Sequence, residues 1–428
     1  MGAMTALTHF IPITFLFLGT LSVRLIEFGE DRKLLSSRDV TADERIDTMY
    51  PLLAYAFEAS PAEPGVREQY RQRMPFFRSA TSLIAEEGGQ TLAGVAAFPM
   101  QQNVRGLVLD MAGVASVASH PSARRRGAVR QLLNRLLHQM REQGSVVSAL
   151  YPFRPSFYGR FGYVGLPRMR RAFFSPQGIS HLVKVELPGT VERLPMGEAF
   201  DEYDAFTRRL LRQRHGFSVF DEVRTAEFRD DKMWVAVARA AGGEVVGAVR
   251  YRIEHFGGDL VGDDFLTAWP LGRALLLQFF ARHVDQVSRI VIKLGADEVP
   301  DLWGTDMAVT TEGRVAYPSN AGPMARVLDM SALAGARAGA GRVTVEVIDD
   351  DLIGGVYRLE SEGGRLTVAA DKAAPAARLT VAGISGLAYG VLDPIDVLAR
   401  GFGQVDAEGV EPLRALFPRE LPYMFADF

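Results

Sequence analysis

Two short segments hold the residue types and spacing most able to do chemistry. The first reads SARRRGAVR over residues 122–130, and the second reads SFYGRFGY over residues 156–163. A glycine between a strand and a helix lets backbone amides approach a phosphate, and the helix start adds partial positive charge. We therefore predict a phosphate-binding loop in the first segment; the alternative is a solvated run of surface charge. The candidate residues of this loop are Arg124, Arg125, Arg126, Gly127, Ala128, Val129 and Arg130.

The second segment places a phenol within a tight turn of aromatic residues and glycines. Tyr158 follows Phe157 and lies close in sequence to Phe161 and Tyr163. A tyrosine hydroxyl, with an ordinary pKa of about 10, can donate a proton to a basic leaving group. The alternative is that Tyr158 is one more aromatic ring packed in a core turn.

Elements of regular structure must position these two segments. From Ser82, short apolar runs separated by glycine and polar turns predict a hairpin-rich antiparallel sheet that reaches residue 119. Apolar residues then recur at helical spacing until Gly144, which predicts a helix and its stop. Residues 145–151 predict the next strand. The apolar face of the helix would consist of Val129, Leu132, Leu133, Leu136, Leu137 and Met140.

A second, weaker copy of this order follows a Pro/Gly boundary at residues 187–189. Residues 233–254 predict a hairpin, residues 273–284 a helix and residues 288–295 a strand. No cluster of arginine and glycine precedes this helix, so we predict a repeat that keeps the scaffold without the phosphate site. From about Tyr317, short strands joined by Gly and Asp turns, with helices after them, predict a third domain of the α+β class.

The order of strand, RRRGAVR, amphipathic helix, strand and FYGRFGY resembles the GNAT acetyltransferases, and the paired RRRG and YGRFGY motifs resemble the Eis family among them. Val129 stands where the GNAT loop has a small residue. The resemblance implies an α/β fold of two tandem GNAT-like domains, the second degenerate, followed by a sterol-carrier-like α+β domain. The corresponding ranges are 22–187, 188–316 and 317–428, after an apolar extension, residues 1–21, that we expect to lie outside the fold.

The resemblance also implies a reaction and the groups that carry it. Acetyl-CoA would bind through the arginine loop and through the backbone of the strand at Val117, Ala118 and Ser119, without a metal. Tyr158 would protonate the leaving CoA thiolate, whose thiol has an ordinary pKa of about 8.5. The terminal carboxylate of Phe428 would help to take the proton from the amine; the alternative is a frayed chain end.

The acceptor that the resemblance implies is a small molecule with several amines, such as an aminoglycoside. Asp427 and Glu58 are candidate acidic wall residues that would attract such a cation, although for Glu58 we favour an ordinary surface position. A protein lysine or a polyamine is the alternative acceptor for the same fold. A lipid-binding module with inactive transferase halves is the alternative of another functional class. The family further implies a homo-hexamer.

The composition limits the remaining classes of function. The 428 residues have a formal net charge of -3 and are 48% hydrophobic, which is typical of a globular protein and argues against nucleic acid as the main partner. There is no cysteine, which excludes thiolate metal sites and a cysteine nucleophile, and the 7 histidines show no close ligand pair. The apolar residues 10–21 are too few to span a bilayer. We expect a cytoplasmic protein, with secretion as the alternative.

Overall fold

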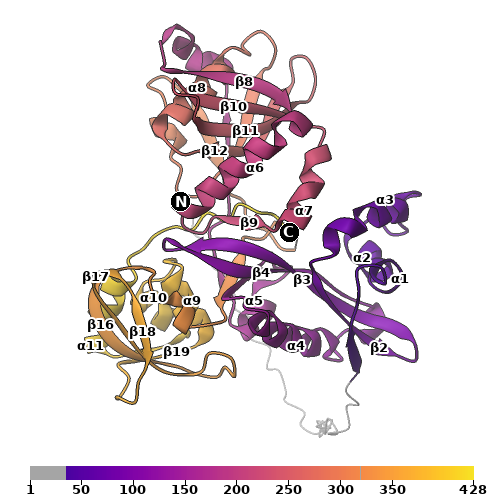
Figure 1. Cartoon of the computed structure of the whole chain (residues 1–428), viewed down its shortest axis with the longest axis vertical. Coiled ribbons are helices and arrows are strands. Elements are labelled where there is room, and N and C mark those ends of the chain that lie inside the picture. The colour runs from indigo at the N-terminus through magenta and orange to yellow at the C-terminus, as the bar shows by residue number, and fades with distance from the viewer. Residues whose placement is uncertain (1–34, 319) are drawn as a thin grey trace, which may run out of the picture. The chain divides into compact units, whose positions relative to one another are not determined.

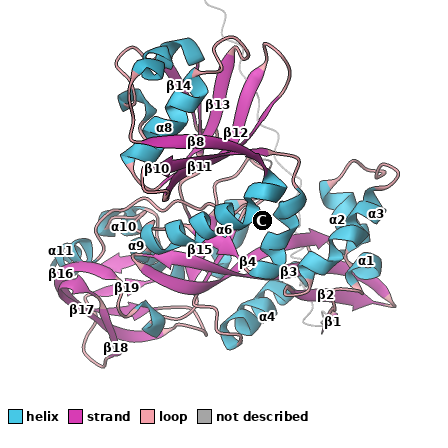
Figure 2. Ribbon diagram, turned by 45° about the horizontal axis from the view of Figure 1, so that its top comes forward, coloured by secondary structure: helices cyan, strands magenta, loops and turns pink. Residues whose placement is uncertain are grey.

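The computed structural model describes residues 35–318 and 320–428, which form three β-sheets with helices packed against them (Figure 1, Figure 2). Each sheet combines antiparallel neighbours with one parallel pair of strands. This mixed architecture confirms the predicted fold class. No helix in the described part of the chain is both long and apolar enough to cross a membrane. The apolar extension expected at residues 1–21 lies outside the described residues.

The first sheet carries both segments singled out in the sequence. Its hairpins follow the predicted ranges, and the parallel pair β4/β5 is connected by α4 (Ala128–Glu142), as expected for a strand, helix, strand unit. The strands, in spatial order, are β1 (Ser36–Asp39), β2 (Thr81–Glu87), β3 (Gln90–Val104), β4 (Leu107–Ser119), β5 (Val147–Leu150), β15 (Met324–Val327) and β6 (Val164–Gly165), with β9 (Ser218–Phe220) paired to β3.

Helix α4 forms because its apolar residues recur at helical spacing, and five of them are buried against the first sheet. The helix ends where Gly144 adopts a left-handed conformation with φ +92°, which a glycine adopts without strain. The predicted helix and its stop are therefore confirmed. The buried side chains are Leu132, Leu133, Leu136, Leu137 and Met140; Val129 is only partly buried.

Strands β4 and β5 separate at one end of the sheet. Their parallel pairing ends at Val114 and Leu150, while β4 continues to Ser119. Just beyond this point the pairing of β3 with β4 shifts register, and Ser116 adopts φ +56°. Such a bulge bends a strand and re-aims its backbone. The result is an opening between two parallel strands, with the backbone of β4 at its edge.

The second sheet repeats this plan. Strands β10 and β11 form the predicted hairpin, and α8 (Pro270–Ala281) connects the parallel strands β12 and β13. At the start of α8, a Cβ on Gly272 would overlap the backbone carbonyl of Val246, so this glycine serves close packing of helix on sheet. The strands, in spatial order, are β14 (Val309–Glu312), β7 (Arg170–Phe174), β13 (Arg289–Leu294), β12 (Asp259–Thr267), β11 (Val245–Ile253), β10 (Trp234–Ala240) and β8 (Gly189–Pro195).

The third sheet belongs to the last part of the chain, as predicted from its short strands and turns. Helix α11 packs against β16, and α9 also contacts β15 of the first sheet. The strands, in spatial order, are β18 (Thr367–Ala370), β17 (Gly355–Arg365), β16 (Arg337–Val347), β19 (Ala377–Leu379) and β20 (Gly403–Val405); the helices are α9 (Val381–Ala388), α10 (Pro394–Ala399) and α11 (Ala407–Leu416).

Three strands lie in the sequence range of one predicted domain but pair with strands of another. Strand β7 precedes residue 187 but belongs to the second sheet, β9 follows residue 188 but pairs with β3, and β15 follows residue 317 but lies between β5 and β6. The three parts are therefore joined by strand pairing as well as by the chain. The boundaries at 187 and 316 stay predictions.

The end of the chain is held along β9 and the residues just before it, and the Ser218 hydroxyl of β9 accepts the backbone amide of Ala426. The backbone amide of Tyr423 donates to the carbonyl of His215 at 2.9 Å, and the Phe425 ring stacks on Phe217 with 4.6 Å between centroids. Buried Arg105 donates to the carbonyl of Pro418 at 2.7 Å. In Figure 1 the C-terminus accordingly lies beside β9. Docking on β9, which pairs with β3, directs the last residues toward the opening in the first sheet.

Candidate active site

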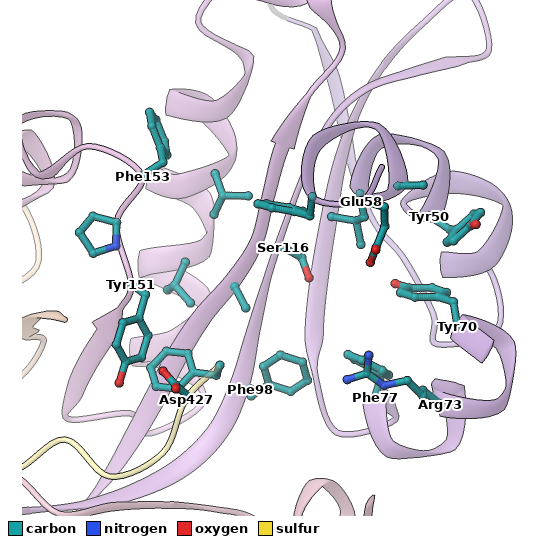
Figure 3. A pocket seen from close by; sticks show the side chains of 18 of the residues that line it. Tyr50, Glu58, Tyr70, Arg73, Phe77, Phe98, Ser116, Tyr151, Phe153 and Asp427 are labelled. Carbon is teal, nitrogen blue, oxygen red and sulfur yellow. The ribbon is translucent and has the colours of Figure 1, made fainter. Parts of the chain in front are cut away.

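A cavity of about 810 Å³ lies against the first sheet at the opening between β4 and β5. One wall comes from α2 (Tyr50–Phe57), α3 (Val66–Arg73) and the short helix Met74–Phe77, and the other from the chain after β5. Figure 3 shows Tyr151 and Asp427 on one side of the cavity and Arg73 with Phe77 on the other. Much of the lining is aromatic: Tyr50, Phe57, Tyr70, Phe77, Phe98, Tyr151, Phe153, Tyr158 and Phe428.

Tyr158 is the last residue of α5 (Pro155–Tyr158) and lines the cavity. Its side chain is 2% exposed, and rings of Phe153 and Phe157 pack edge-on against it at 5.5 Å and 5.0 Å. Burial, and then the nearby Tyr163 phenol, raise the pKa of Tyr158 well above its ordinary value. The aromatic packing foreseen as the alternative for this residue is present, and it holds the phenol in place at the cavity wall.

Phe428 lines the same cavity as Tyr158. Its ring packs edge-on against Tyr151, at 5.5 Å between centroids, and against Phe220 at 6.2 Å. A Cβ on Gly113 of β4 would lie 3.0 Å from this ring, so the missing side chain at Gly113 leaves space for it. The last residue is therefore packed on three sides by the sheet, the β5 end and β9.

The strand residues predicted to meet acetyl-CoA lie along β4 at the edge of the opening. Val117 lines the cavity, together with Ala115 and Ser116 of the bulge. Ala118 and Ser119 continue the strand toward the arginine loop. Because β5 ends at Leu150, no parallel strand among the described residues pairs with this part of the β4 backbone on that side. The edge can pair with an amide-containing chain instead.

The arginine loop lies directly after β4 and ends at the start of α4. Arg124, Arg125 and Arg126 are exposed, and Arg125 and Gly127 adopt left-handed conformations with φ +65° and +89°. The first amide of the helix with an intrahelical partner is that of Gln131, so the amides of residues 128–130 point outward from the helix start. This arrangement of amides and charge fits a diphosphate.

One arginine of the loop already has a carboxylate partner. Arg126 donates two hydrogen bonds to Glu87, at 2.8 Å and 2.9 Å, which raise the pKa of Arg126 above its ordinary value. Arg124 and Arg125 form no ion pair within the described residues. They, and the exposed Arg130 in the first turn of α4, are the charges of the loop available to a ligand.

Substituting Gly127→Ala is expected to weaken acetyl-CoA binding about tenfold, as for the loss of a charge-assisted hydrogen bond. A Cβ at Gly127 would meet no atom within 4 Å, so the change strains the backbone and obstructs the amides without a clash. Gly144→Ala is the matched control, because Gly144 has a similar φ and equally open surroundings at the other end of α4. Calorimetry with acetyl-CoA should show weaker binding for the first variant alone; equal affinity in both would contradict a phosphate role for Gly127.

The two candidate acidic wall residues both line the cavity, including Glu58, for which the sequence favours an ordinary surface position. Glu58 follows the last residue of α2, is exposed, and points into the cavity (Figure 3). Asp427 lies beside Tyr151 and forms an ion pair with Lys293, at 3.0 Å between Oδ2 and Nζ. Lys293 thus offsets the negative charge of the Asp427 side chain.

Sequence reasoning missed the basic residues of the cavity. Arg73, Arg168 and Arg224 line it, and Arg45 lies behind its wall. These residues come from separate parts of the chain, and nothing in their local sequence distinguishes them from surface arginines. Only the fold brings them together.

Parts of this chain are similar in sequence to known proteins. Residues 37–165 match the family described as "Acetyltransferase (GNAT) domain". An uncharacterized N-acetyltransferase of Streptomyces coelicolor is 27% identical over 274 residues, which are 58% of this chain and 64% of that protein, so the match spans less than two thirds of the relative. These matches confirm the predicted acetyltransferase relationship.

Solved structures show a similar fold over most of the chain. A GCN5-related N-acetyltransferase from Kribbella flavida superposes with a TM-score of 0.76 at 20% identity, covering 92% of this chain and 99% of that one. Eis1 from Mycobacterium abscessus superposes with a TM-score of 0.67 at 19% identity, covering 81% of this chain and 90% of Eis1. The three-sheet fold is therefore that of the Eis-like proteins, as predicted.

Proposed function

We propose that this chain, whose fold is Eis-like and whose first part matches the GNAT acetyltransferases, is an N-acetyltransferase. In the proposed reaction, the acetyl group of acetyl-CoA passes directly to a primary amine in the cavity beside β4. The observation that carries the proposal is that Tyr158 and Phe428, 270 positions apart in the sequence, line one cavity. The open edge of β4 lines it at Val117 and continues toward the arginine loop. On the other side, the wall of α2 and α3 leaves space for an acceptor.

Acetyl-CoA would be held by two features of the chain. The amides at the start of α4, with Arg124, Arg125 and Arg130, would bind the diphosphate. The backbone of Val117 to Ser119 would hydrogen-bond to the amides of the pantetheine arm, as a sheet edge binds an added strand. The thioester would then lie at the inner end of the opening, beside Tyr158.

The reaction forms one bond and breaks another. The amine nitrogen attacks the thioester carbon, the new C–N bond forms, and the C–S bond breaks with both electrons leaving on sulfur. The Tyr158 hydroxyl donates its proton to that sulfur and is reprotonated from solvent. The proton lost by the amine passes to the α-carboxylate of Phe428. General acid and base groups placed in this way contribute typically 10²- to 10⁴-fold each.

The proton transfer from the amine has a limit set by ordinary pKa values. A free α-carboxyl near 3.5 cannot directly deprotonate an ammonium near 10, because about six units correspond to about 8 kcal/mol. Three routes remove this limit: burial raises the pKa of the carboxyl, a water molecule relays the proton, or the acceptor enters as the neutral amine. In each case the Phe428 carboxylate stabilises the positive charge that develops on nitrogen as the bond forms.

The acceptor class implied by the Eis resemblance is a small molecule with several amines, such as an aminoglycoside, and polyamines and protein lysines are the other candidates. Glu58 and Asp427 favour a cation in the cavity, whereas the arginines that line it do not. Release of free thiol from acetyl-CoA, followed with aminoglycosides, polyamines and lysine peptides, tests the proposed function. Thiol release with none of these or any simpler amine would contradict it, and tight lipid binding would then favour the lipid-binding alternative.

The dependence of kcat on pH should show no alkaline loss from Tyr158. Burial raises the pKa of this phenol above its ordinary value of about 10. The phenol therefore keeps its proton at every pH below about 10. We expect kcat to rise as the amine becomes neutral and then to stay level up to about pH 10. A fall near pH 8 to 9 that disappears in Tyr158→Phe would show that Tyr158 ionises in the working range, contrary to this expectation.

The hexamer implied by the Eis resemblance is part of the proposal for the intact protein. Sedimentation equilibrium of the purified chain measures it directly, and a monomer at micromolar concentration would remove this part without affecting the chemistry above.

A further inference from the structure

Three arginine side chains surround one aromatic ring at the end of the cavity formed by α3. The guanidinium carbons of Arg45, Arg73 and Arg224 lie 5.0, 5.7 and 5.5 Å from the centre of the Phe77 ring. They come from α1 (Arg45–Thr48), α3 and α7 (Glu222–Thr225), so three separate elements bring positive charge to one place. We call these three residues the arginine cluster.

The arginine cluster has too few carboxylates to balance it. Glu227 pairs with both Arg73 and Arg224, and Arg45 forms no ion pair within residues 35–318 and 320–428. Two further carboxylates near Arg224 are engaged elsewhere: Asp231 pairs with Arg250 at 2.9 Å, and Asp221 accepts the backbone amide at the start of α7. The three guanidinium groups thus have one ion-paired carboxylate, which Arg73 and Arg224 share.

The two inner arginines are strongly desolvated. Arg45 is 0% exposed, and its contacts are neutral hydroxyls, among them Tyr70 at 3.5 Å and Ser116 at 3.4 Å, both of which line the cavity. The Arg224 side chain is 9% exposed, and burial, followed by the charge of Arg73, lowers the pKa of Arg224 to about 10. Buried charge without a partner is unfavourable, and a bound anion would offset it.

We propose that the acceptor carries an anionic group, a carboxylate or a phosphate, in addition to its amine, and that the arginine cluster binds this group. This inference rests on the proposed function, since it assigns a binding site to the other end of the same acceptor. The planar guanidinium fork matches both anions and binds them through paired hydrogen bonds.

The arrangement of the cavity orients such an acceptor. Figure 3 shows Arg73 and Phe77 across the cavity from Tyr151 and Phe153, and Phe153 packs against Tyr158. An amine at Tyr158 and an anion at the arginine cluster would therefore occupy opposite walls. A pure polycation would meet the arginine cluster as a like charge. Among the described side chains that line the cavity, the acidic ones are Glu58 and the Lys293-paired Asp427.

The test compares acceptors of equal reach that differ at one end. For each chain length from two to six methylenes, the ω-aminocarboxylate and aminoalkylphosphonate are compared with the simple alkylamine and the diamine, with kcat/KM measured by thiol release. We expect one or both anionic series to exceed the matched alkylamine by at least about tenfold at the best length, as for a hydrogen-bonded charge. The two anionic series distinguish carboxylate from phosphate.

Arg73→Ala tests the arginine cluster with little risk to folding, because the Arg73 side chain is 49% exposed. The change leaves Glu227 to neutralise Arg224, so the preference for the anionic acceptor should fall to less than about threefold. Arg71→Ala is the matched control: Arg71 lies on the same helix and pairs with Glu68 at 2.7 Å, outside the cavity lining. The control should keep the preference of the unchanged protein.

Calorimetry of the same acceptors in the presence of CoA tests the anion site independently of the proposed reaction. If no amine releases thiol but the anionic acceptors still bind and Arg73→Ala weakens them, the proposed reaction fails and the anion site stands. Three outcomes would overturn the anion site while leaving the transferase reaction intact. They are equal turnover of alkylamines and anionic acceptors, a preference for diamines, and a preference for anionic acceptors that survives Arg73→Ala.

Discussion

Tyr158→Phe is expected to lower kcat for acetyl transfer by roughly 10²- to 10⁴-fold and to leave the affinity for acetyl-CoA within about twofold. The substitution removes only the hydroxyl group, since the ring keeps its contacts with Phe153, Phe157 and Tyr163. The loss should therefore appear in the chemical step, measured by single-turnover kinetics with a good acceptor.

Tyr163→Phe is the control for this prediction. Tyr163 lies in the same FYGRFGY segment and is equally buried, but its hydroxyl pairs with Ser148 at 2.7 Å and does not line the cavity. Its loss should reduce stability by about 1 kcal/mol and leave kcat nearly unchanged. Single-turnover rates that are the same in Tyr158→Phe and in the unchanged protein would show that another group protonates the thiolate.

Converting the Phe428 carboxylate into a carboxamide, by protein ligation, is expected to reduce kcat/KM by about 10²-fold or more. The ring would still fill its place between Tyr151 and Phe220, so only the charge and the proton acceptor are lost. A C-terminal tag should have a larger effect, because a chain that continues past Phe428 must leave the cavity.

The same tag at the N-terminus is the control, and melting temperatures confirm folding of both proteins. The anchoring of the tail by Tyr423 and Phe425 should keep the tagged protein folded while activity is lost. Full activity of the carboxamide protein would remove the carboxylate from the mechanism, whatever the tag does.

Local patterns in the sequence predicted the elements whose cause is local. The spacing of Leu132, Leu133, Leu136 and Leu137 specifies α4, and the turns between short apolar runs specify the hairpins of the first two sheets. The strand β12 was not predicted, because Gly262-Asp263-Asp264 interrupts its apolar pattern. Its burial between β11 and β13 overrides that weak local signal.

Features that depend on long-range pairing could not be predicted from one sequence. No local pattern indicates that β9 pairs with β3 or that β15 lies between β5 and β6, yet β9 supports the chain end beside the cavity. The motifs indicated Tyr158 and the arginine loop as candidates, and the resemblance indicated Phe428; their roles stay predictions. The arginine cluster could not be predicted from the sequence, because Arg45, Arg73 and Arg224 meet only in the folded chain.

The proposed reaction requires the phenol of Tyr158, the carboxylate of Phe428 and the thioester of acetyl-CoA to meet in one cavity. A crystal structure of the protein with CoA bound measures this directly. We expect the CoA sulfur in the opening between β4 and β5, within about 3 to 4 Å of the Tyr158 hydroxyl, with the Phe428 carboxylate facing the same space. A sulfur bound away from Tyr158, or a Phe428 carboxylate turned to solvent, would contradict the proposed mechanism.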